Sequence, residues 1–226
     1  MSLIRRNADA KSAAEACGAK VLRLLAKAVA ERGRATLAIS GGSSPKIMFE
    51  FFSRSDFDWS QVHIFWVDER CVPPDHAESN FRLAYDSWLK ALPAANIHRV
   101  QTELGSDEAA QQYADEIRPF LPLDVIHRGM GADAHTASLF PGDPLIDDPT
   151  GLVGVAHRAT TRITLLRSVL ESARHTVVLA TGTDKAEPLN AVLRGPLDVR
   201  HYPAQIAALD PTTATWFVDQ AAAANL

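Results

Sequence analysis

Cysteine is scarce in this sequence of 226 residues, which contains only Cys17 and Cys71, far apart in the chain. Two distant thiols do not form the disulfide framework of a small secreted protein, and we expect both to be free in a reducing compartment. The chain has eight histidines, but no C-x-x-C or H-E-x-x-H spacing accompanies them. We therefore expect a protein that requires neither a metal nor another cofactor.

Long hydrophobic runs are also missing. No stretch approaches the roughly 20 apolar residues that a membrane-spanning helix needs. The N-terminal segment, MSLIRRNADAKS, lacks the apolar core of a secretory signal peptide. We therefore expect a cytoplasmic protein without a membrane partner.

No long run of basic residues is present either, and the formal net charge is −4. This charge argues against a general nucleic-acid-binding protein. A phosphorylated substrate would have to be bound by a few local cations. The sequence does not decide between a monomer and a homodimer.

The remaining composition is that of an ordinary globular protein, and the length is sufficient for a substantial core. We expect one domain over residues 1–226. Strand patterns alternate with helix patterns, which predicts an α/β fold with a doubly wound, mostly parallel sheet. Helices are expected at 8–32, from 44 to 52, and at 79–92, 106–120, 166–173 and 183–193. Strands are expected at 35–39, 62–67, 123–126, 152–156, 163–165 and 175–180, with 215–219 closing the edge of the sheet.

The segment 129–142, GMGADAHTASLFPG, holds the densest group of reactive side chains. It follows the apolar run 123–126, and open α/β sheets bind their ligands at the carboxyl ends of such strands. Its glycines allow close backbone approach, and Asp133 and His135 supply an acid and a base. We expect the chemistry of the protein to take place here.

A dinucleotide site is the competing interpretation, because GMGADA fits the loose pattern G-x-G-x-x-G/A. That fingerprint opens a helix and is followed by an acid at the end of a second strand about 20 residues later. Pro141, Gly142 and Pro144 interrupt any helix here, and Asp147 and Asp148 lie in a turn rich in proline and glycine. The sequence therefore disfavours a nicotinamide or flavin site.

A second candidate site is the turn Gly41, Gly42, Ser43 and Ser44, which lies between the strand 35–39 and a helix. Ser44 is expected to be the N-cap of that helix and Pro45 its first residue. Exposed amides and a positive helix end suit a phosphate, although turns of this kind often only connect two elements. The Gly-Lys-Ser/Thr ending of a Walker loop is missing.

Two cations also stand near predicted strand ends. Arg70 follows the strand 62–67 and could bind a phosphate bidentately, although charges at a strand end are usually solvated. Lys185 lies in the first turn of a helix, where its charge opposes the helix dipole. This placement suggests a bound anion, but taken alone it fits a solvent-facing lysine equally well. Strand ends near residues 40, 68, 129 and 181 meet at one edge of a parallel sheet, so we expect all these groups to share one crevice.

The segments ISGGSSP, DERCVPPDHAESN, GMGADAHTASLFPG and TGTDKAEPL together resemble the 6-phosphogluconolactonases of the sugar-phosphate isomerase superfamily. The resemblance covers residues 35–206 in the right order. It implies hydrolysis of 6-phosphogluconolactone to 6-phosphogluconate in the oxidative pentose phosphate pathway, without a metal. It also implies that His135 is the general base, that Asp133 orients the site, and that Arg70 and Lys185 surround the substrate phosphate together with residues 41–44.

The chain departs from this family pattern at two places. Ala134 stands where the family usually has glycine, and His127 and Arg128 stand where it usually has two apolar residues. If residue 134 has a positive φ, an alanine costs roughly 1–2 kcal/mol there and could re-aim His135. A buried strand end would also have to accommodate Arg128.

Two other functions compete with the lactonase. Amino-sugar-phosphate isomerases and deaminases of the same superfamily typically have Asp-Glu-Tyr at residues 68–70 and Asn-Glu-Pro at residues 140–142. This chain has Asp-Glu-Arg and Phe-Pro-Gly there, which favours a lactonase. A non-catalytic sugar-phosphate sensor is another alternative, but the length and basic charge for an added DNA-binding segment are missing. A catalytically weak, sugar-phosphate-binding relative of the lactonases stays open through Ala134.

Overall fold

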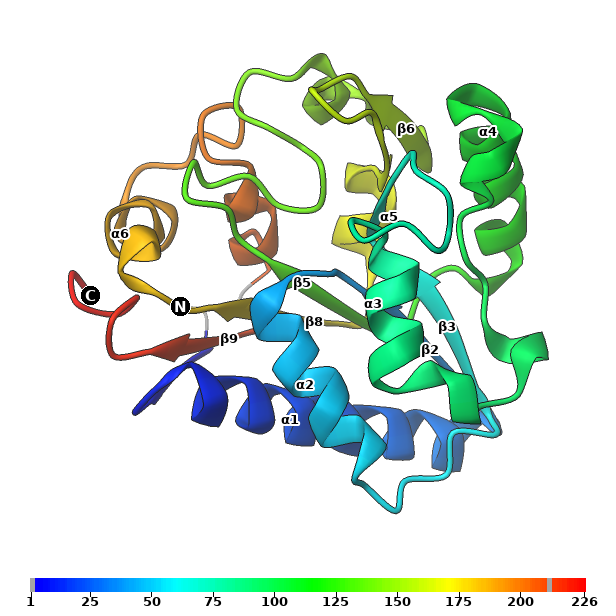
Figure 1. Cartoon of the computed structure of the whole chain (residues 1–226). Coiled ribbons are helices and arrows are strands. Elements are labelled where there is room, and N and C mark those ends of the chain that lie inside the picture. The colour runs from blue at the N-terminus through cyan, green and yellow to red at the C-terminus, as the bar shows by residue number, and fades with distance from the viewer. Residues whose placement is uncertain (1–2, 211–212) are drawn as a thin grey trace.

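The computed structural model describes residues 3–210 and 213–226, and it is built around a six-stranded sheet (Figure 1). The strand order is β1-β9-β8-β5-β2-β3, and every pairing in this sheet is parallel. The prediction of a doubly wound α/β fold is therefore confirmed. The strands are β1 (Leu3–Asn7), β2 (Ala35–Ile39), β3 (Val62–Trp66), β5 (Val125–Gly129), β8 (His175–Ala180) and β9 (Ala214–Asp219).

Helices cover both faces of this sheet (Figure 1). Successive residues of a strand point to opposite faces, so Leu37 packs with the first helix group and Ala38 with the second. The first group consists of α1 (Ala10–Arg32), α2 (Ser43–Ser53) and α3 (Asn80–Ser87), and the second of α4 (Ser106–Ile117), α5 (Arg167–Ser172) and α6 (Ala186–Arg194).

The first helix has a clear start and stop in the sequence. Asp9 accepts a hydrogen bond from the amide of Ser12, whose hydroxyl oxygen accepts one from the amide of Asp9, and this capping box begins α1. Gly33 ends the helix with a φ of 75°, a left-handed conformation that glycine adopts without steric cost. The expected helix at 8–32 and its glycine stop are confirmed within two residues.

Short 3-10 turns replace the ends of several expected helices. The helix expected to reach residue 92 ends at Ser87, and the one expected to reach residue 120 ends at Ile117. Residues 183–185 also form a 3-10 turn before α6 begins. The 3-10 helices are η1 (Leu89–Ala91), η2 (Ala94–Asn96), η3 (Thr102–Leu104), η4 (Arg118–Phe120), η5 (Pro144–Asp147), η6 (Thr183–Lys185) and η7 (Pro203–Ala208).

Two features of the sheets differ from the sequence-based expectation. Strand β1 pairs outside β9, so the segment 215–219 lies inside the sheet and does not close its edge. The expected strand 62–67 ends at Trp66, and the chain then enters a small antiparallel sheet of order β4-β7-β6. Its strands are β4 (Asp68–Arg70), β6 (Val153–Ala156) and β7 (Arg162–Leu165).

Strand β5 buries two polar side chains on opposite faces. His127 and Arg128 are 0% and 1% exposed, so the strand does accommodate the arginine. Both ring nitrogens of His127 lack a hydrogen-bond partner among the described residues, and burial lowers the pKa of His127 to about 3. A buried polar group without a partner costs stability.

We predict that His127→Leu stabilises the fold by roughly 1–3 kcal/mol at neutral pH, since it removes an unsatisfied polar group. The benefit should grow in acid. The folded-state pKa of about 3 lies below the ordinary 6.5, so the unfolded chain binds the proton first and stability falls as the pH drops below 6.5. At pH 5 this loss is about 2 kcal/mol, and the variant should not show it.

Urea denaturation at neutral pH and at pH 5 measures both effects. His157→Leu, at an exposed histidine, is the control. It should change neither the stability at neutral pH nor the stability lost at pH 5. Equal acid sensitivity of wild type and His127→Leu would contradict the assignment of that sensitivity to His127.

Candidate active site

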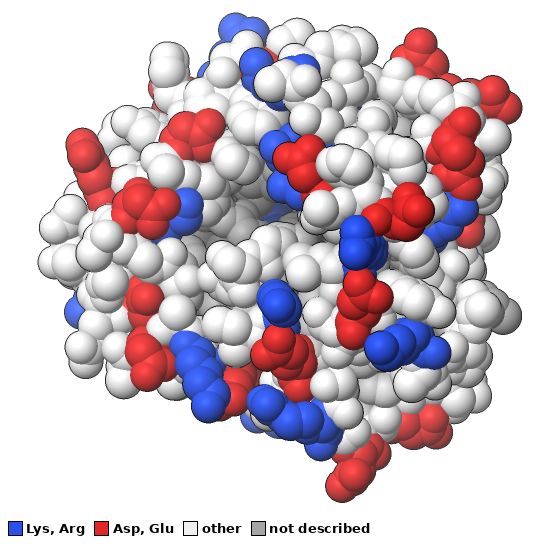
Figure 2. Space-filling view, in the orientation of Figure 1, with Lys and Arg blue, Asp and Glu red and all other residues white. Residues whose placement is uncertain are grey.

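Four segments of the chain meet at a cavity of about 260 Å³ beside the carboxyl ends of the parallel strands. The segments near residues 40, 68, 129 and 181 all line it, as the sequence predicts. Three of them follow β2, β5 and β8 of the parallel sheet, whereas Asp68 begins β4 of the small antiparallel sheet. Figure 2 shows the hollow in this face, with Lys and Arg atoms at its rim and in its floor. The cavity therefore concentrates positive charge in a chain of net charge −4. Seven predicted site residues line its wall, namely Gly41, Gly42, Ser43, Ser44, Arg70, His135 and Lys185.

The turn between β2 and α2 supplies one wall of the cavity. Helix α2 begins at Ser43 with Gly42 as its N-cap, so the expectation that Ser44 is the N-cap is wrong. Gly42 has a φ of 123°, which disfavours a residue with a side chain, and no side chain caps the first turn. The amides of Ser43 and Ser44 thus remain available at the positive end of the helix.

Hydrogen bonds tie this turn to neighbouring elements. The Ser44 hydroxyl lies 2.7 Å from the hydroxyl of Thr181, which joins the carboxyl ends of β2 and β8. Both carboxylate oxygens of the buried Asp219 accept a hydrogen bond from the amide of Gly182 at 3.1 Å. A Cβ at Gly41 would lie 2.0 Å from Oδ1 of Asn80. Only glycine therefore allows α3 to approach the turn this closely.

Arg70 is held by its neighbour Glu69. The buried Glu69 carboxylate accepts hydrogen bonds from the amides of Arg70, Asn80 and Phe81 at 2.7 to 2.8 Å and fixes the intervening loop. Burial raises the pKa of Glu69, and these hydrogen bonds oppose the shift. The Nη1 of Arg70 donates to the carbonyl of Glu78 at 2.8 Å. The strand-end charges at 68–70 are thus mostly buried, unlike the usual solvated strand end.

Lys185 reaches the cavity from the turn after β8. Its Nζ lies 2.8 Å from Oδ2 of Asp184, whose side chain is 60% exposed. This partner reduces the local positive charge only in part, because an exposed ion pair is weak. The ammonium group therefore remains able to bind an anion in the cavity.

Arg162 is a cavity residue that the sequence analysis missed. It comes from β7, and its Nη1 lies 3.9 Å from Oδ2 of the buried Asp68. That carboxylate also accepts a hydrogen bond from the hydroxyl of Ser138 at 2.7 Å. Burial lowers the pKa of Arg162, and the charge of Asp68 opposes this shift. Only the pairing of β4 with β7 brings Arg162 here, so no local motif could have revealed it.

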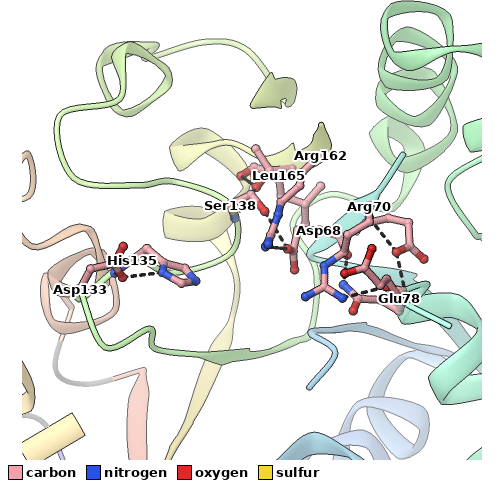
Figure 3. A network of polar contacts seen from close by, with 11 residues as sticks. Asp68, Arg70, Glu78, Asp133, His135, Ser138, Arg162 and Leu165 are labelled. Carbon is pink, nitrogen blue, oxygen red and sulfur yellow. Dashed lines mark hydrogen bonds and ion pairs between the residues drawn. The ribbon is translucent and has the colours of Figure 1, made fainter. Parts of the chain in front are cut away.

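The loop after β5 presents His135 to the cavity. Figure 3 shows its ring pointing across the gap toward Asp68, Arg70 and Arg162. The Nδ1 atom lies 2.5 Å from Oδ1 of Asp133, which also accepts a hydrogen bond from the amide of His135 at 3.1 Å. Partial burial raises the pKa of Asp133, but these hydrogen bonds and the charge of His135 lower it overall.

The backbone of this loop is tightly constrained. A Cβ at Gly131 would lie 2.0 Å from Nδ1 of His135 and 2.6 Å from Oδ1 of Asp133. Ala134 and Ala137 have φ values of 64° and 54°, in the left-handed region. The helix that a dinucleotide fingerprint needs does not follow Gly129 in the described chain, because the loop continues to the 3-10 helix at Pro144–Asp147. The absence of this helix agrees with the sequence, which disfavours a nicotinamide or flavin site.

Other functional classes can be assessed from the described parts of the chain. No group of three or more His, Cys, Asp or Glu side chains there could hold a metal ion. None of the described helices has the length and apolarity that crossing a membrane requires.

Comparisons with known proteins agree with this geometry. Residues 8–216 match the family model of glucosamine-6-phosphate isomerases and 6-phosphogluconolactonases. The chain belongs to this family. A 6-phosphogluconolactonase of Synechocystis is 36% identical over 215 residues, which cover 89% of each chain.

Solved structures of the family have the same fold. A 6-phosphogluconolactonase of Shewanella baltica superposes with a TM-score of 0.88 at 27% identity, covering 97% of this chain and 98% of the other. A monomeric glucosamine-6-phosphate deaminase superposes with a TM-score of 0.84 at 14% identity, covering 99% and 100%. The fold is thus common to both branches of the family, and only the site can distinguish them.

We predict that Gly131→Ala lowers kcat at least 100-fold, because its methyl group would displace the His135 ring from Asp133. Gly129→Ala, two residues earlier at the end of β5, is the matched control. Its methyl group would approach no atom closer than the Leu179 carbonyl oxygen at 3.9 Å, so most activity should remain. Steady-state kinetics with a sugar-phosphate lactone measure kcat for both variants. An equal loss of kcat in the two variants would contradict this role of Gly131.

We predict that Ala134→Gly stabilises the fold by about 1 kcal/mol, since glycine adopts the observed left-handed φ without the steric cost. Its kcat should not change, because the present backbone already has the conformation that glycine prefers. Ala137→Gly is the matched control and should stabilise the fold similarly. Thermal unfolding and kinetics measure both quantities. A large rise in kcat for Ala134→Gly alone would show instead that Ala134 re-aims His135.

Proposed function

We propose that the chain hydrolyses 6-phospho-D-glucono-1,5-lactone to 6-phosphogluconate in the oxidative pentose phosphate pathway. The observation that carries the proposal is His135, which is paired with Asp133 and faces a cavity lined by Arg70, Arg162 and Lys185. A base on one side and cations on the other suit a substrate with an electrophilic carbonyl and a distant phosphate. The curated relative from Synechocystis supports the same substrate.

His135 would act as the general base. Because Nδ1 faces the Asp133 carboxylate, it carries the proton of the neutral imidazole, and the lone pair is then on Nε2. Nε2 can take a proton from a water molecule as the water oxygen attacks the lactone carbonyl carbon. Asp133 holds the ring in this tautomer and stabilises the imidazolium that forms.

The same imidazolium completes the reaction. The attack forms a tetrahedral intermediate with a negatively charged oxygen, and its collapse breaks the bond between the carbonyl carbon and the ring oxygen. The proton on Nε2 then passes to the ring oxygen, which becomes a hydroxyl group of the open chain. The new carboxylic acid ionises to the carboxylate, so one water is consumed and one proton is released. This scheme uses no metal and no cofactor.

The phosphate would lie at the other side of the cavity. Arg70 and Lys185 provide positive charge, and the amides of Ser43 and Ser44 lie at the positive end of α2. Arg162 adds a third cation, which Asp68 partly balances. Gly41 and Gly42 allow the phosphate oxygens to approach the backbone closely.

The main alternative is an amino-sugar-phosphate isomerase or deaminase. The shared fold does not separate the two activities, but the residues at 68–70 and 140–142 favour the lactonase. A sugar-phosphate-binding relative with little activity is the other alternative, and it rests on Ala134. The left-handed φ of Ala134 weakens this alternative, since the loop keeps a conformation suited to glycine.

We also propose that the chain acts in the cytoplasm as one domain over residues 1–226, as a monomer or a homodimer. Two observations support the compartment. Cys17 and Cys71 are both free thiols, and burial raises the pKa of the Cys17 thiol. An unreactive buried thiol and a lone half-buried one are consistent with a reducing environment.

We predict that His135→Asn lowers kcat for freshly generated 6-phosphogluconolactone by about 10²- to 10⁴-fold, because general-base catalysis is lost. His201→Asn is the matched control. His201 also pairs with an acid, Asp198, at 2.7 Å, but its side chain is 77% exposed. This variant should keep wild-type activity.

Each rate is measured above spontaneous hydrolysis, with and without a chelator, and the chelator should have no effect. Wild-type protein without lactonase activity would overturn the proposed function. Turnover of glucosamine 6-phosphate in place of the lactone would assign the chain to the other branch of the family.

A further inference from the structure

Phe140 contacts the candidate general base from outside the cavity. Its ring centroid lies 4.6 Å from that of His135, and the two ring planes are inclined by 36°. Among the described residues, the wall of the cavity includes His135 but not Phe140. The aromatic ring is therefore placed to act on the imidazole and not on a bound substrate.

The imidazole of His135 needs more than one contact to keep its direction. Its ring hydrogen bond to Asp133 fixes the position of Nδ1 (Figure 3), but the ring can still turn about the line of that bond. The side chain of Asp133 is itself 51% exposed, and an exposed partner restrains a charged or polar side chain only weakly. A flat ring packed against the imidazole limits this turning, because van der Waals contact leaves no space for it.

Arg158 contacts the turn that carries Phe140. In this turn, residues 140–143, the amide of Asp143 donates a hydrogen bond to the carbonyl of Phe140 at 2.9 Å. Arg158 lies in the segment between β6 and β7, and its Cζ is 4.4 Å from the centroid of the Phe140 ring. Its Nη2 donates to Oδ2 of Asp143 at 3.0 Å. One guanidinium group thus binds both the ring and the carboxylate of the same turn.

The carboxylate of Asp143 is a well-fixed partner for Arg158. The Asp143 side chain is 10% exposed, and its Oδ1 accepts a hydrogen bond from the amide of Leu145 as the N-cap of η5. An exposed ion pair and a cation over an aromatic ring are each weak alone. Here both contacts act on one short turn, so together they restrict the position of Phe140.

A second arginine approaches the same ring less closely. The Cζ of Arg162 lies 5.6 Å from the Phe140 centroid, but Arg162 also lines the cavity. Arg158 does not line it in the part of the chain that the structure describes. Arg158 can therefore be replaced without removing a cation from the cavity wall.

We propose that Phe140 is a positioning residue for His135, and that Arg158 acts on catalysis through Phe140. With the ring in place, Nε2 of His135 stays directed at the water that attacks the lactone carbonyl. Without the ring, the hydrogen bond to Asp133 remains, but Nε2 points over a wider range of directions. Proton transfer then takes place from fewer of the bound states. This proposal rests on the proposed function, in which His135 is the general base.

Steady-state kinetics with freshly generated lactone test the proposal. Phe140→Leu should lower kcat by about 10- to 100-fold, and Arg158→Met by about 3- to 10-fold. KM should stay within about twofold of the wild-type value in both variants, because neither residue lines the cavity. Arg200→Met is the matched control and should keep wild-type kcat. Arg200 also forms an ion pair beside this turn, with Asp147 at 2.6 Å, but its side chain is 60% exposed.

The double variant Phe140→Leu/Arg158→Met separates action through the ring from an independent effect. If Arg158 acts through Phe140, its replacement should lower kcat no further once Phe140 has been replaced. A double variant in which the two losses multiply would overturn the proposal. Wild-type kcat in Arg158→Met, or a raised KM with unchanged kcat in Phe140→Leu, would also overturn it.

The NMR signals of the His135 ring give a readout that needs no activity. These signals, assigned by their loss in His135→Asn, should move in Arg158→Met and stay in place in Arg200→Met. Unmoved signals in Arg158→Met would overturn the action of Arg158 on His135. Absence of lactonase activity in the wild type would overturn the proposed function, and the NMR result would then decide on the positioning alone.

Discussion

The parallel order of the central sheet is the constraint on which the rest of this structure depends. Parallel strands place all their carboxyl ends at one edge, so loops from distant parts of the sequence meet there. Side-chain bonds then fix these loops to one another. The Ser44 and Thr181 hydroxyls join β2 to β8, and Asp68 joins β4 to the loop that contains Ser138. These polar contacts between strand ends thus hold the walls of the cavity in place.

Strain in this structure is concentrated next to the candidate general base. Ala134 and Ala137 have left-handed backbones, and Gly131 leaves just enough room for the His135 ring. Backbone strain persists only where surrounding contacts enforce it. Here the pairing of His135 with Asp133 and the hydrogen bond from Ala204 to Ala134 hold the loop. These contacts hold the left-handed backbone of the loop despite its steric cost. In this conformation the imidazole of His135 points into the cavity.

Local patterns in the sequence predicted the elements that local interactions determine. The strand at 175–180 and the glycine stop of α1 follow from burial patterns and from φ preferences. The edge position of β1 and the small antiparallel sheet depend on pairings between distant segments, which no local pattern encodes. The same limit explains the candidate site. His135 and Arg70 lie in recognisable motifs, whereas Arg162 reaches the cavity only through the pairing of β7 with β4.

We infer, above all, that segments from the whole chain form one site with a base at one side and phosphate-binding groups at the other. A crystal structure with bound 6-phosphogluconate tests this most directly. We expect the phosphate to lie between the start of α2, Arg70 and Lys185, and the carboxylate to lie beside Nε2 of His135. A ligand bound in the reverse orientation, or outside this cavity, would contradict it.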